Sequence, residues 1–350
     1  MQQKTSRTVF LDLLRIFACF FVIVNHTCGD LFLLDTPDNP IWFVSVAYFF
    51  LATTAVPVFF MISGYLLLGK QDSWRKTFQR IGRILAVLMG CAVVYGVYNV
   101  LKDAASLSLP AIVKNIIEEI VKVYLRSPSN ALWYLYAYLG MLVMMPFLQK
   151  LSGAMQKRDY HFFFLFAGIF ISVAPILRHY SSYLTINPYF QLPLFSGYVT
   201  MLFIGQYFAR FGTARSGKRL AIAMLTLTGA IALCVAATYG EYLRDPANYL
   251  YFEDVTLLPI ALASVSVFCI FSWTSIPHRA APVISEVGAC TFGIYLISDL
   301  VIDALSPAYA AAYAAPFPFA AVVVYEIGLF LCGLALTVLL RKIPGIRKFL

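Results

Sequence analysis

Long apolar runs, many of them close to 20 residues, alternate along the chain with short polar segments. An α-helix of about 20 apolar residues spans the hydrocarbon core of a bilayer, which is roughly 30 Å thick. The pattern therefore predicts an all-α, polytopic membrane protein with about ten transmembrane helices. We expect these helices at residues 8–29, 41–68, 82–101, 131–149, 160–177, 194–210, 219–239, 252–273, 283–303 and 317–340.

The composition supports a chain that is built into a membrane. Of the 350 residues, 61% are hydrophobic and only 12% are charged, unlike the balance of a soluble domain. No long hydrophilic region interrupts the apolar runs, so we predict a single membrane domain over residues 1–350. Its outer side would carry three substantial loops, at residues 102–130, 178–193 and 240–251.

The basic residues are distributed unevenly between the two sides of the predicted membrane domain. With the N-terminus inside, nineteen of the 26 Lys and Arg residues fall in cytoplasmic segments and six in outer segments, while Arg15 lies within the first helix. Cytoplasmic loops are enriched in basic residues, so both termini are predicted to be cytoplasmic. The same distribution accounts for the net charge of +9 and argues against nucleic acid as a partner.

The outer loops are of two kinds. Residues 102–130 interleave apolar side chains at helical spacing with charged residues such as Lys114 and Glu118. This pattern predicts an amphipathic helix that lies on the outer face or covers a cavity. The loops 178–193 and 240–251 are rich in Tyr and Asn, which fits either an aromatic belt at the membrane edge or a saccharide-stacking surface.

The cysteines give no sign of a cross-linked or metal-binding framework. There are seven, none in a CxxC pair, and all but Cys28 fall well inside apolar runs. We interpret them as small buried hydrophobic residues and expect neither a disulfide framework nor a metal site.

The first helix carries the strongest chemical signal, because Asp12, Arg15 and His26 lie within an apolar run. Ionisable groups at membrane depth are costly and by default indicate a functional site or a wet cavity. Arg15 and His26 are separated by about three turns, roughly 16 Å along one helix face, and Asp12 lies one turn before Arg15. A neutral imidazole at His26 could take a proton from a hydroxyl nucleophile. Alternatively, His26 only hydrogen-bonds to a neighbouring helix.

A second basic cluster lies at the inner end of the third predicted helix. Lys76, Arg80 and Arg83 share one helix face at spacings of four and three residues. Flanking of a membrane helix by basic residues would place them there without any further role. The functional alternative is a phosphate clamp, because Arg presents forked donors to phosphate oxygens.

Together, motifs spread over nearly the whole chain resemble the acyltransferase-3 family of membrane acyltransferases. Arg15 and His26 match an Arg-x10-His motif, and Arg80 and Arg83 match Arg-x-x-Arg. The other matches are Phe59-Phe60-Met61-Ile62-Ser63-Gly64-Tyr65, Leu132-Trp133-Tyr134-Leu135 with the later Pro146, and Thr291-Phe292-Gly293-Ile294-Tyr295-Leu296-Ile297. Within the family, the chain looks most like a short single-domain branch that is similar to the enterobacterial-common-antigen O-acetyltransferase.

Two positions depart from the family pattern. Many members have His where this chain has Ala131 and Ser298, so His26 is the only motif histidine left. This concentrates the role of base on His26. It argues against a relay through a second imidazole and leaves room for a divergent activity.

The resemblance implies an O-acyltransferase, most simply an O-acetyltransferase, of a bacterial inner membrane. It would move an acyl group from cytosolic acyl-CoA, usually acetyl-CoA, to a hydroxyl of an extracytoplasmic or lipid-linked glycan. Acyl-CoA would be a substrate, and no tightly bound cofactor is expected. The implied catalytic residues are His26 as base and Arg15, which Asp12 would orient. We favour direct transfer, with an acyl-His26 intermediate as the alternative.

The resemblance also assigns the two substrates to different residues. Arg80, Arg83 and Arg15 would bind the CoA donor, and Trp133 and Tyr134 would contact the acceptor. Membrane lipid would surround the helices.

A transporter or exporter of a small molecule or glycan is the competing class. Proton-coupled transport usually needs a carboxylate deep in the helix bundle, and Glu326 is the best candidate. Glu326 and Asp299 are also candidate site groups or, alternatively, polar residues that pair helices, and Glu286 is expected at the membrane interface. The arginine cluster of the third helix favours the enzyme.

Overall fold

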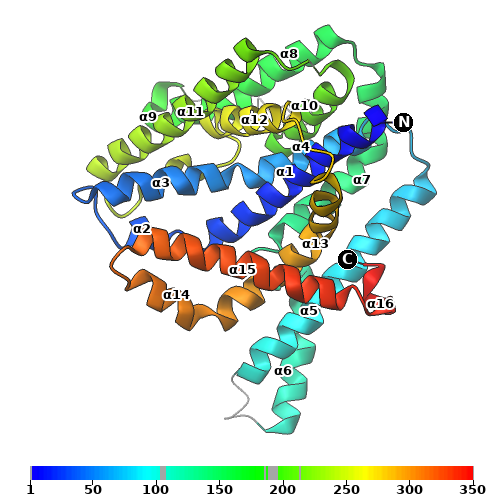
Figure 1. Cartoon of the computed structure of the whole chain (residues 1–350), viewed down its shortest axis with the longest axis vertical. Coiled ribbons are helices and arrows are strands. Elements are labelled where there is room, and N and C mark those ends of the chain that lie inside the picture. Colours follow the sequence, from blue (N-terminus) through cyan, green and yellow to red (C-terminus); the bar gives the residue numbers. More distant parts are fainter. Residues whose placement is uncertain (1, 103–107, 185–186, 188–195, 213, 350) are drawn as a thin grey trace.

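The computed structural model describes residues 2–102, 108–184, 187, 196–212 and 214–349. Every regular element in these residues is a helix (Figure 1), which confirms the all-α prediction. Two of the predicted loops are described only in part. Residues 103–107 of the first, and 185–186 and 188–193 of the second, lie outside the described residues.

The described elements follow one another as α-helices with a few short 3-10 and π turns. The α-helices are α1 (Gln2–Thr27), α2 (Asp30–Leu33), α3 (Pro40–Thr53), α4 (Ala55–Leu67), α5 (Trp74–Lys102), α6 (Leu109–Val121), α7 (Trp133–Ala154), α8 (Lys157–Ala167), α9 (Ala174–Tyr180), α10 (Gly197–Phe211), α11 (Gly217–Arg244), α12 (Leu258–Ser272), α13 (Ala281–Ala304), α14 (Ser306–Tyr313), α15 (Pro318–Leu340) and α16 (Pro344–Arg347). The turns are η2 (Lys122–Tyr124), the π-helical η3 (Gly168–Val173), η4 (Ser182–Leu184) and η5 (Tyr251–Glu253).

Within the described residues, eight segments are long and apolar enough to cross a membrane. The chain is therefore a multi-pass membrane protein. The helices expected at residues 131–149 and 194–210 also form, as α7 and α10, but they are not among these eight. α10 has 15 residues, fewer than the ~20 needed to span a bilayer. The tyrosines in the first turns of α7 lower its hydropathy.

The span predicted at residues 41–68 is confirmed as one segment able to cross a membrane, Pro40–Leu67, but it consists of two helices. α3 ends at Thr53 and α4 begins at Ala55, with Thr54 between them. Pro57 explains the break, because it lacks the N–H that would bond the Thr53 carbonyl and its ring disfavours a straight helix. The third helix is also longer than predicted. It begins at Trp74, so Arg80 and Arg83 lie inside it and not at its end.

The amphipathic helix expected in residues 102–130 is α6, but it does not cover the central cavity described below. α6 packs back along α5, so closely that a Cβ on Gly96 would lie 3.2 Å from Cβ of Glu119. Its apolar residues Val113 and Ile117 are exposed and suit contact with lipid. The sequence did not determine the position of α6, because amphipathicity defines an apolar face without specifying whether lipid or protein covers it.

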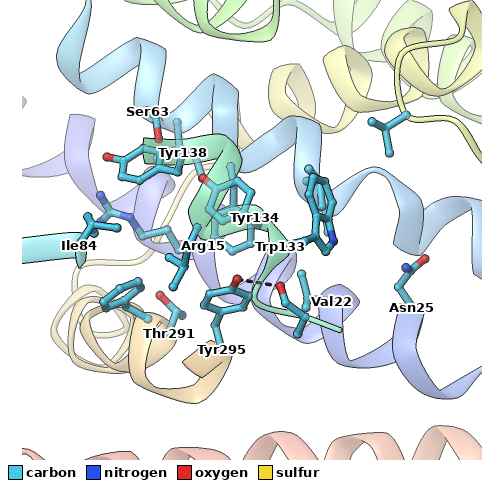
Figure 2. A pocket seen from close by; sticks show the side chains of 18 of the residues that line it. Arg15, Val22, Asn25, Ser63, Ile84, Trp133, Tyr134, Tyr138, Thr291 and Tyr295 are labelled. Carbon is cyan, nitrogen blue, oxygen red and sulfur yellow. Dashed lines mark hydrogen bonds between the residues drawn. The ribbon is translucent and has the colours of Figure 1, made fainter. Parts of the chain in front are cut away.

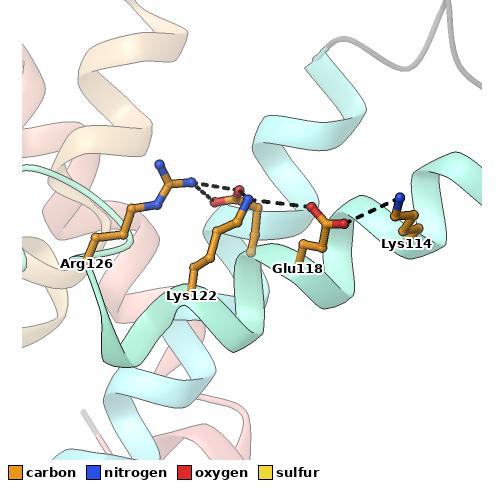
Figure 3. A network of polar contacts seen from close by, with 5 residues as sticks. Lys114, Glu118, Lys122 and Arg126 are labelled. Carbon is orange, nitrogen blue, oxygen red and sulfur yellow. Dashed lines mark hydrogen bonds and ion pairs between the residues drawn. The ribbon is translucent and has the colours of Figure 1, made fainter.

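Charged residues of α6 and η2 form a chain of ion pairs (Figure 3). Lys114 and Lys122 both approach Glu118, at 3.7 and 3.6 Å, and Arg126 approaches Glu119 at 2.8 Å. Burial raises the pKa of Glu119, but hydrogen bonds from Lys122 and Arg126 outweigh it and lower the pKa below its usual value. Exposed pairs of this kind each contribute about 0–1 kcal/mol, so they orient α6 more than they stabilise the fold.

α1 is the central helix of the bundle. It packs against α3, α4, α12, α13 and α15 (Figure 1). Leu11, Leu14 and Ala18 on α1 are fully buried in these contacts. The start of α1 and the short α16 lie on the same side of the bundle in Figure 1.

α4 and α10 approach until their backbones touch. A Cβ on Gly64 would lie 1.9 Å from the carbonyl oxygen of Leu202, and one on Gly205 would lie 1.9 Å from that of Met61. Small residues allow this close approach between membrane helices. Because each glycine meets backbone and not a flexible side chain, no rotamer change can make room for a larger residue.

We therefore predict that Gly205→Ala destabilises the protein. The added methyl group must push α4 and α10 apart, and overpacking of this kind costs about 1–3 kcal/mol. The melting temperature of the detergent-solubilised protein should fall. The matched control is Gly140→Ala in α7, where nothing lies within 4 Å of the added Cβ and the higher helix propensity of Ala is worth up to about 1 kcal/mol. Equal melting temperatures for the two variants would contradict the close α4–α10 contact.

Candidate active site

A cavity of about 550 Å³ lies within the bundle, lined mainly by α1, α3, α4, α5, α7 and α13. This volume is typical of small-molecule sites, which occupy ~300–1,000 Å³. Figure 2 shows Arg15, Tyr138 and Ser63 at one end of the cavity and Trp133 and Asn25 at the other. We call the two ends the arginine end, formed by Arg15, Arg80 and Arg83, and the histidine end, formed by His26, Asn25, Trp133 and Glu253.

The arginine end brings together the three guanidinium groups that the sequence predicted. Arg15 on α1 and Arg80 and Arg83 on α5 all line the cavity, and all three interact electrostatically with Tyr138 of α7. The expected pairing of Arg15 with Asp12 is confirmed, because Arg15 Nη1 donates to Asp12 Oδ1 at 2.6 Å. The cluster therefore joins residues from two helices that are distant in sequence.

Residues of α13 hold Asp12 in place. Ser285 Oγ donates to Asp12 Oδ2 at 3.0 Å, and a Cβ on Gly288 would lie 2.7 Å from Cβ of Asp12. The second oxygen of Asp12 is thus used by α13 while the first binds Arg15. The orientation of Arg15 in the cavity depends on this arrangement.

Asp72, in the loop before α5, holds Arg80 in place. Arg80 Nη1 donates to Asp72 Oδ2 at 2.5 Å, Lys76 Nζ lies 2.8 Å from Asp72 Oδ1, and Gln149 Nε2 donates at 3.1 Å. Burial raises the pKa of Asp72, but these hydrogen bonds and the charge of Arg80 outweigh it and hold the pKa well below its usual range. Asp72 therefore stays ionised and neutralises one of the two cations beside it.

Arg83 has no carboxylate partner among the described residues. Its Nη2 donates to the backbone carbonyl of Phe349 at 3.3 Å, and its side chain is exposed. Lys76 and Arg83 thus leave an excess of positive charge at the arginine end. Such a surface attracts a multiply charged anion.

The histidine end carries few charges. His26 in the last turn of α1 lines the cavity together with Asn25, Trp133 and Glu253. His26 interacts electrostatically with Asp299 of α13. Hydrogen-bonding groups beside an exposed Trp ring are typical of sites that bind saccharides or other polyhydroxylated molecules.

Between the two ends, aromatic rings narrow the cavity. Tyr134 and Tyr138 of α7 stack at 5.9 Å, and Tyr134 meets Tyr295 of α13 edge to face at 6.1 Å (Figure 2). The sequence had singled out Tyr134 and the Tyr295 motif, but not Tyr138. The signal was present in the helical spacing of four residues, which puts Tyr134 and Tyr138 on one face.

Other polar residues considered from sequence lie outside the cavity. Glu326 of α15 is fully buried and accepts hydrogen bonds from Thr27 at 2.9 Å and Tyr48 at 2.7 Å. It therefore pairs helices, as the alternative interpretation held. Glu286 is mostly exposed beside Arg341, in keeping with an interfacial position. All seven cysteines are free thiols, and five of them are buried.

The predicted outer loops do not line the cavity in their described parts. The cavity-lining residues nearest to loop 240–251 in the sequence are Glu253 and Val255, which follow it. Tyr249 of that loop packs against Trp42 at 6.2 Å and donates to the carbonyl of Phe32. The ring of Tyr249 therefore stabilises the fold and does not line the cavity.

The donor sets of the site suit organic substrates better than a metal ion. No group of three or more His, Cys, Asp or Glu residues that could hold a metal occurs within the described ranges. The cavity instead joins a cationic end to an imidazole end. This arrangement can hold an anionic substrate at one end while a base acts on a second substrate at the other.

Comparison with known proteins gives the class of chemistry. A family model described as an acyltransferase domain, that of the acyltransferase-3 family, matches residues 8–342. No curated protein and no solved structure matches the chain significantly. The matched range includes both ends of the cavity and favours the enzyme over the transporter. The chain thus belongs to the acyltransferase-3 family and is a multi-pass membrane acyltransferase.

Proposed function

We propose that the protein transfers an acyl group, most simply acetyl, from cytosolic acyl-CoA to a hydroxyl group of an extracytoplasmic or lipid-linked glycan. The observation that carries this proposal is the single cavity with Arg15, Arg80 and Arg83 at one end and His26 at the other. A donor held at the cationic end and an acceptor held at the histidine end could meet inside it. The membrane would be the bacterial inner membrane, with the arginine end facing the cytosol.

The charge of the arginine end supports a CoA donor. CoA carries several phosphates on one part and its thioester at the far end of a long flexible arm. Arg80 and Arg83 offer forked donors for phosphate oxygens, and charge-assisted bonds of this kind are about twice as strong as neutral ones. Arg15, held by Asp12, lies on the route that the arm would take toward His26.

The imidazole of His26 supports direct transfer. In this step His26 takes the proton from the acceptor hydroxyl while the hydroxyl oxygen bonds to the thioester carbonyl carbon. The C–S bond then breaks, and the CoA thiolate leaves with the proton returned by His26. Within the described residues, no Ser or Cys makes a hydrogen bond to His26, which a covalent serine or cysteine mechanism would require.

The histidine end supports a glycan acceptor. Trp133 presents an exposed aromatic ring, and Tyr134 continues the aromatic surface into the cavity. Asn25 and Glu253 supply polar groups that can orient sugar hydroxyls.

We predict that His26→Ala abolishes transfer while leaving the protein folded. General base catalysis contributes about 10²–10⁴-fold, so the transfer of labelled acetyl from acetyl-CoA to membrane glycans should fall by at least about 100-fold. His278→Ala, at an exposed loop position, is the matched control and should behave like the wild type. Transfer by His26→Ala at the wild-type rate would rule out His26 as the base.

The donor end makes a separate prediction. Arg80→Ala combined with Arg83→Ala should weaken acetyl-CoA binding to the purified protein by at least about tenfold, because each lost bond to a charged group is worth about 1.5–3 kcal/mol. Calorimetric titration with acetyl-CoA measures this loss. Arg279→Ala combined with Arg215→Ala, both at exposed positions outside the cavity, removes the same two charges and controls for net charge. Unchanged affinity in the double variant would contradict a phosphate clamp.

The acceptor can be identified in cells. Mass spectrometry of surface glycans should show one acyl group per repeating unit that disappears when the gene is deleted and returns with the wild-type gene. Restoration of the acyl group by a gene encoding His26→Ala would contradict the proposal. A mass difference of about 42 Da, the value for one acetyl group, distinguishes acetyl from larger acyl groups.

A further inference from the structure

Asp299 of α13 lies just outside the cavity but holds one of its walls. The backbone N–H of Ala131 donates to Asp299 Oδ2 at 3.0 Å, and Tyr295 Oη donates to the carbonyl oxygen of Ala131 at 2.8 Å. The two α13 residues are four positions apart and so lie on one helix face. Together they fix both polar groups of Ala131, the residue at which the chain enters α7.

This clamp determines where the aromatic surface of the histidine end lies. Ala131 and Tyr295 both line the cavity, and Trp133 and Tyr134 follow Ala131 after one intervening residue, Leu132. The chain entering α7 is thereby tied to α13 through a carboxylate and a phenol. The backbone amide of Ala131 and the carboxylate of Asp299 meet at this place.

The charge of Asp299 is not balanced by a cation. Its only hydrogen bond among the described residues comes from the neutral Ala131 amide. Asp303, one turn further along α13, differs in this respect, because Lys102 and Tyr98 both donate to it. An unbalanced carboxylate at this depth is costly, and it interacts electrostatically with His26.

Other ionisable groups lie on the neighbouring elements. Glu326 of α15 is bound by Thr27 and Tyr48, and Tyr95 of α5 donates to a backbone carbonyl. Glu253, the last residue of η5, lines the histidine end of the cavity itself. Asp299 is the carboxylate of α13 that interacts electrostatically with the imidazole.

We propose that Asp299 is a positioning residue of the transfer step: it fixes the start of α7 and stabilises the imidazolium that forms when His26 takes the acceptor proton. This inference rests on the proposed function. The imidazolium exists only after proton transfer, so a fixed negative charge beside it stabilises the transition state more than the ground state. The charge acts through space, since the Asp299 oxygen is bonded to Ala131.

Three substitutions separate the two roles. Asp299→Asn keeps an oxygen acceptor for the Ala131 N–H and removes the carboxylate, Asp299→Glu keeps a carboxylate, and Tyr295→Phe loosens the clamp while leaving Asp299 in place. The matched control is Asp303→Asn, on the same helix but facing α5. Transfer of labelled acetyl from acetyl-CoA to endogenous glycan in membrane vesicles is followed from pH 5 to about pH 9, a range that covers the usual titration of His.

Asp299→Asn should lower the maximal rate by about tenfold and leave the affinity for acetyl-CoA unchanged. It should also move the acidic limb of the pH–rate profile to lower pH, because loss of the negative charge makes the imidazole easier to deprotonate. Asp299→Glu should return the acidic limb to its wild-type pH. Tyr295→Phe should lower the rate without moving the limb, and Asp303→Asn should change neither.

The outcomes distinguish this inference from the proposed function. If His26→Ala retains transfer, the assigned base is wrong and the proposed mechanism fails first. If His26→Ala is inactive but Asp299→Asn keeps the wild-type rate and pH profile, Asp299 has no part in the step. If the acidic limb of the pH–rate profile lay at the same pH in Asp299→Asn and Asp299→Glu, the proposed role of the charge would also be wrong. If Asp299→Asn does not fold, Tyr295→Phe still tests the inference. A shift of the acidic limb in Tyr295→Phe would show that fixing the start of α7 and stabilising the imidazolium are not separate roles.

Discussion

The contact between α1 and α13 is the constraint on which the site depends. α1 carries polar side chains through the centre of the bundle, and in a membrane each such side chain needs a partner. α13 supplies these partners at several levels. Near the arginine end Ser285 binds Asp12, in the middle the Thr291 carbonyl accepts from Cys19 at 3.4 Å, and at the histidine end Asp299 interacts electrostatically with His26.

The same contact explains why two distant motifs belong to one site. The late Thr291–Ile297 motif lies on the helix that supports the Arg15 and His26 motif of α1. Gly288 permits the close approach, because any side chain there would collide with Asp12. Replacing either helix face alone would leave polar groups without partners inside the membrane.

Local spacing was sufficient to predict part of this arrangement. The pairing of Asp12 with Arg15 follows from residues three positions apart on one helix, and the apolar runs located most of the helices. The role of Ser285 was out of reach, because it lies 273 positions from Asp12 in the chain and no periodicity relates the two. Asp72 was missed for a similar reason, since its bond to Arg80 joins a loop to a helix.

Other errors have local causes. Hydropathy alone runs smoothly across residues 41–68, whereas Pro57 removes a backbone donor and divides the segment at Thr54. For α6, the sequence specified an apolar face but not the neighbour, and Gly96 with Glu119 shows that α5 is that neighbour. The family match gives the acyl-transfer chemistry, and the proposed mechanism assigns that chemistry to side chains of the cavity.

The glycine contact between α4 and α10 has a consequence for how the enzyme could move. Where Gly64 and Gly205 bring two backbones together, there is no layer of side chains that could exchange rotamers as the helices slide. α4 and α10 therefore behave as one rigid unit, and α4 presents a fixed wall to the cavity. An opening that admits substrates is then expected at another wall of the cavity, such as the one formed by α5, which carries two of the three arginines.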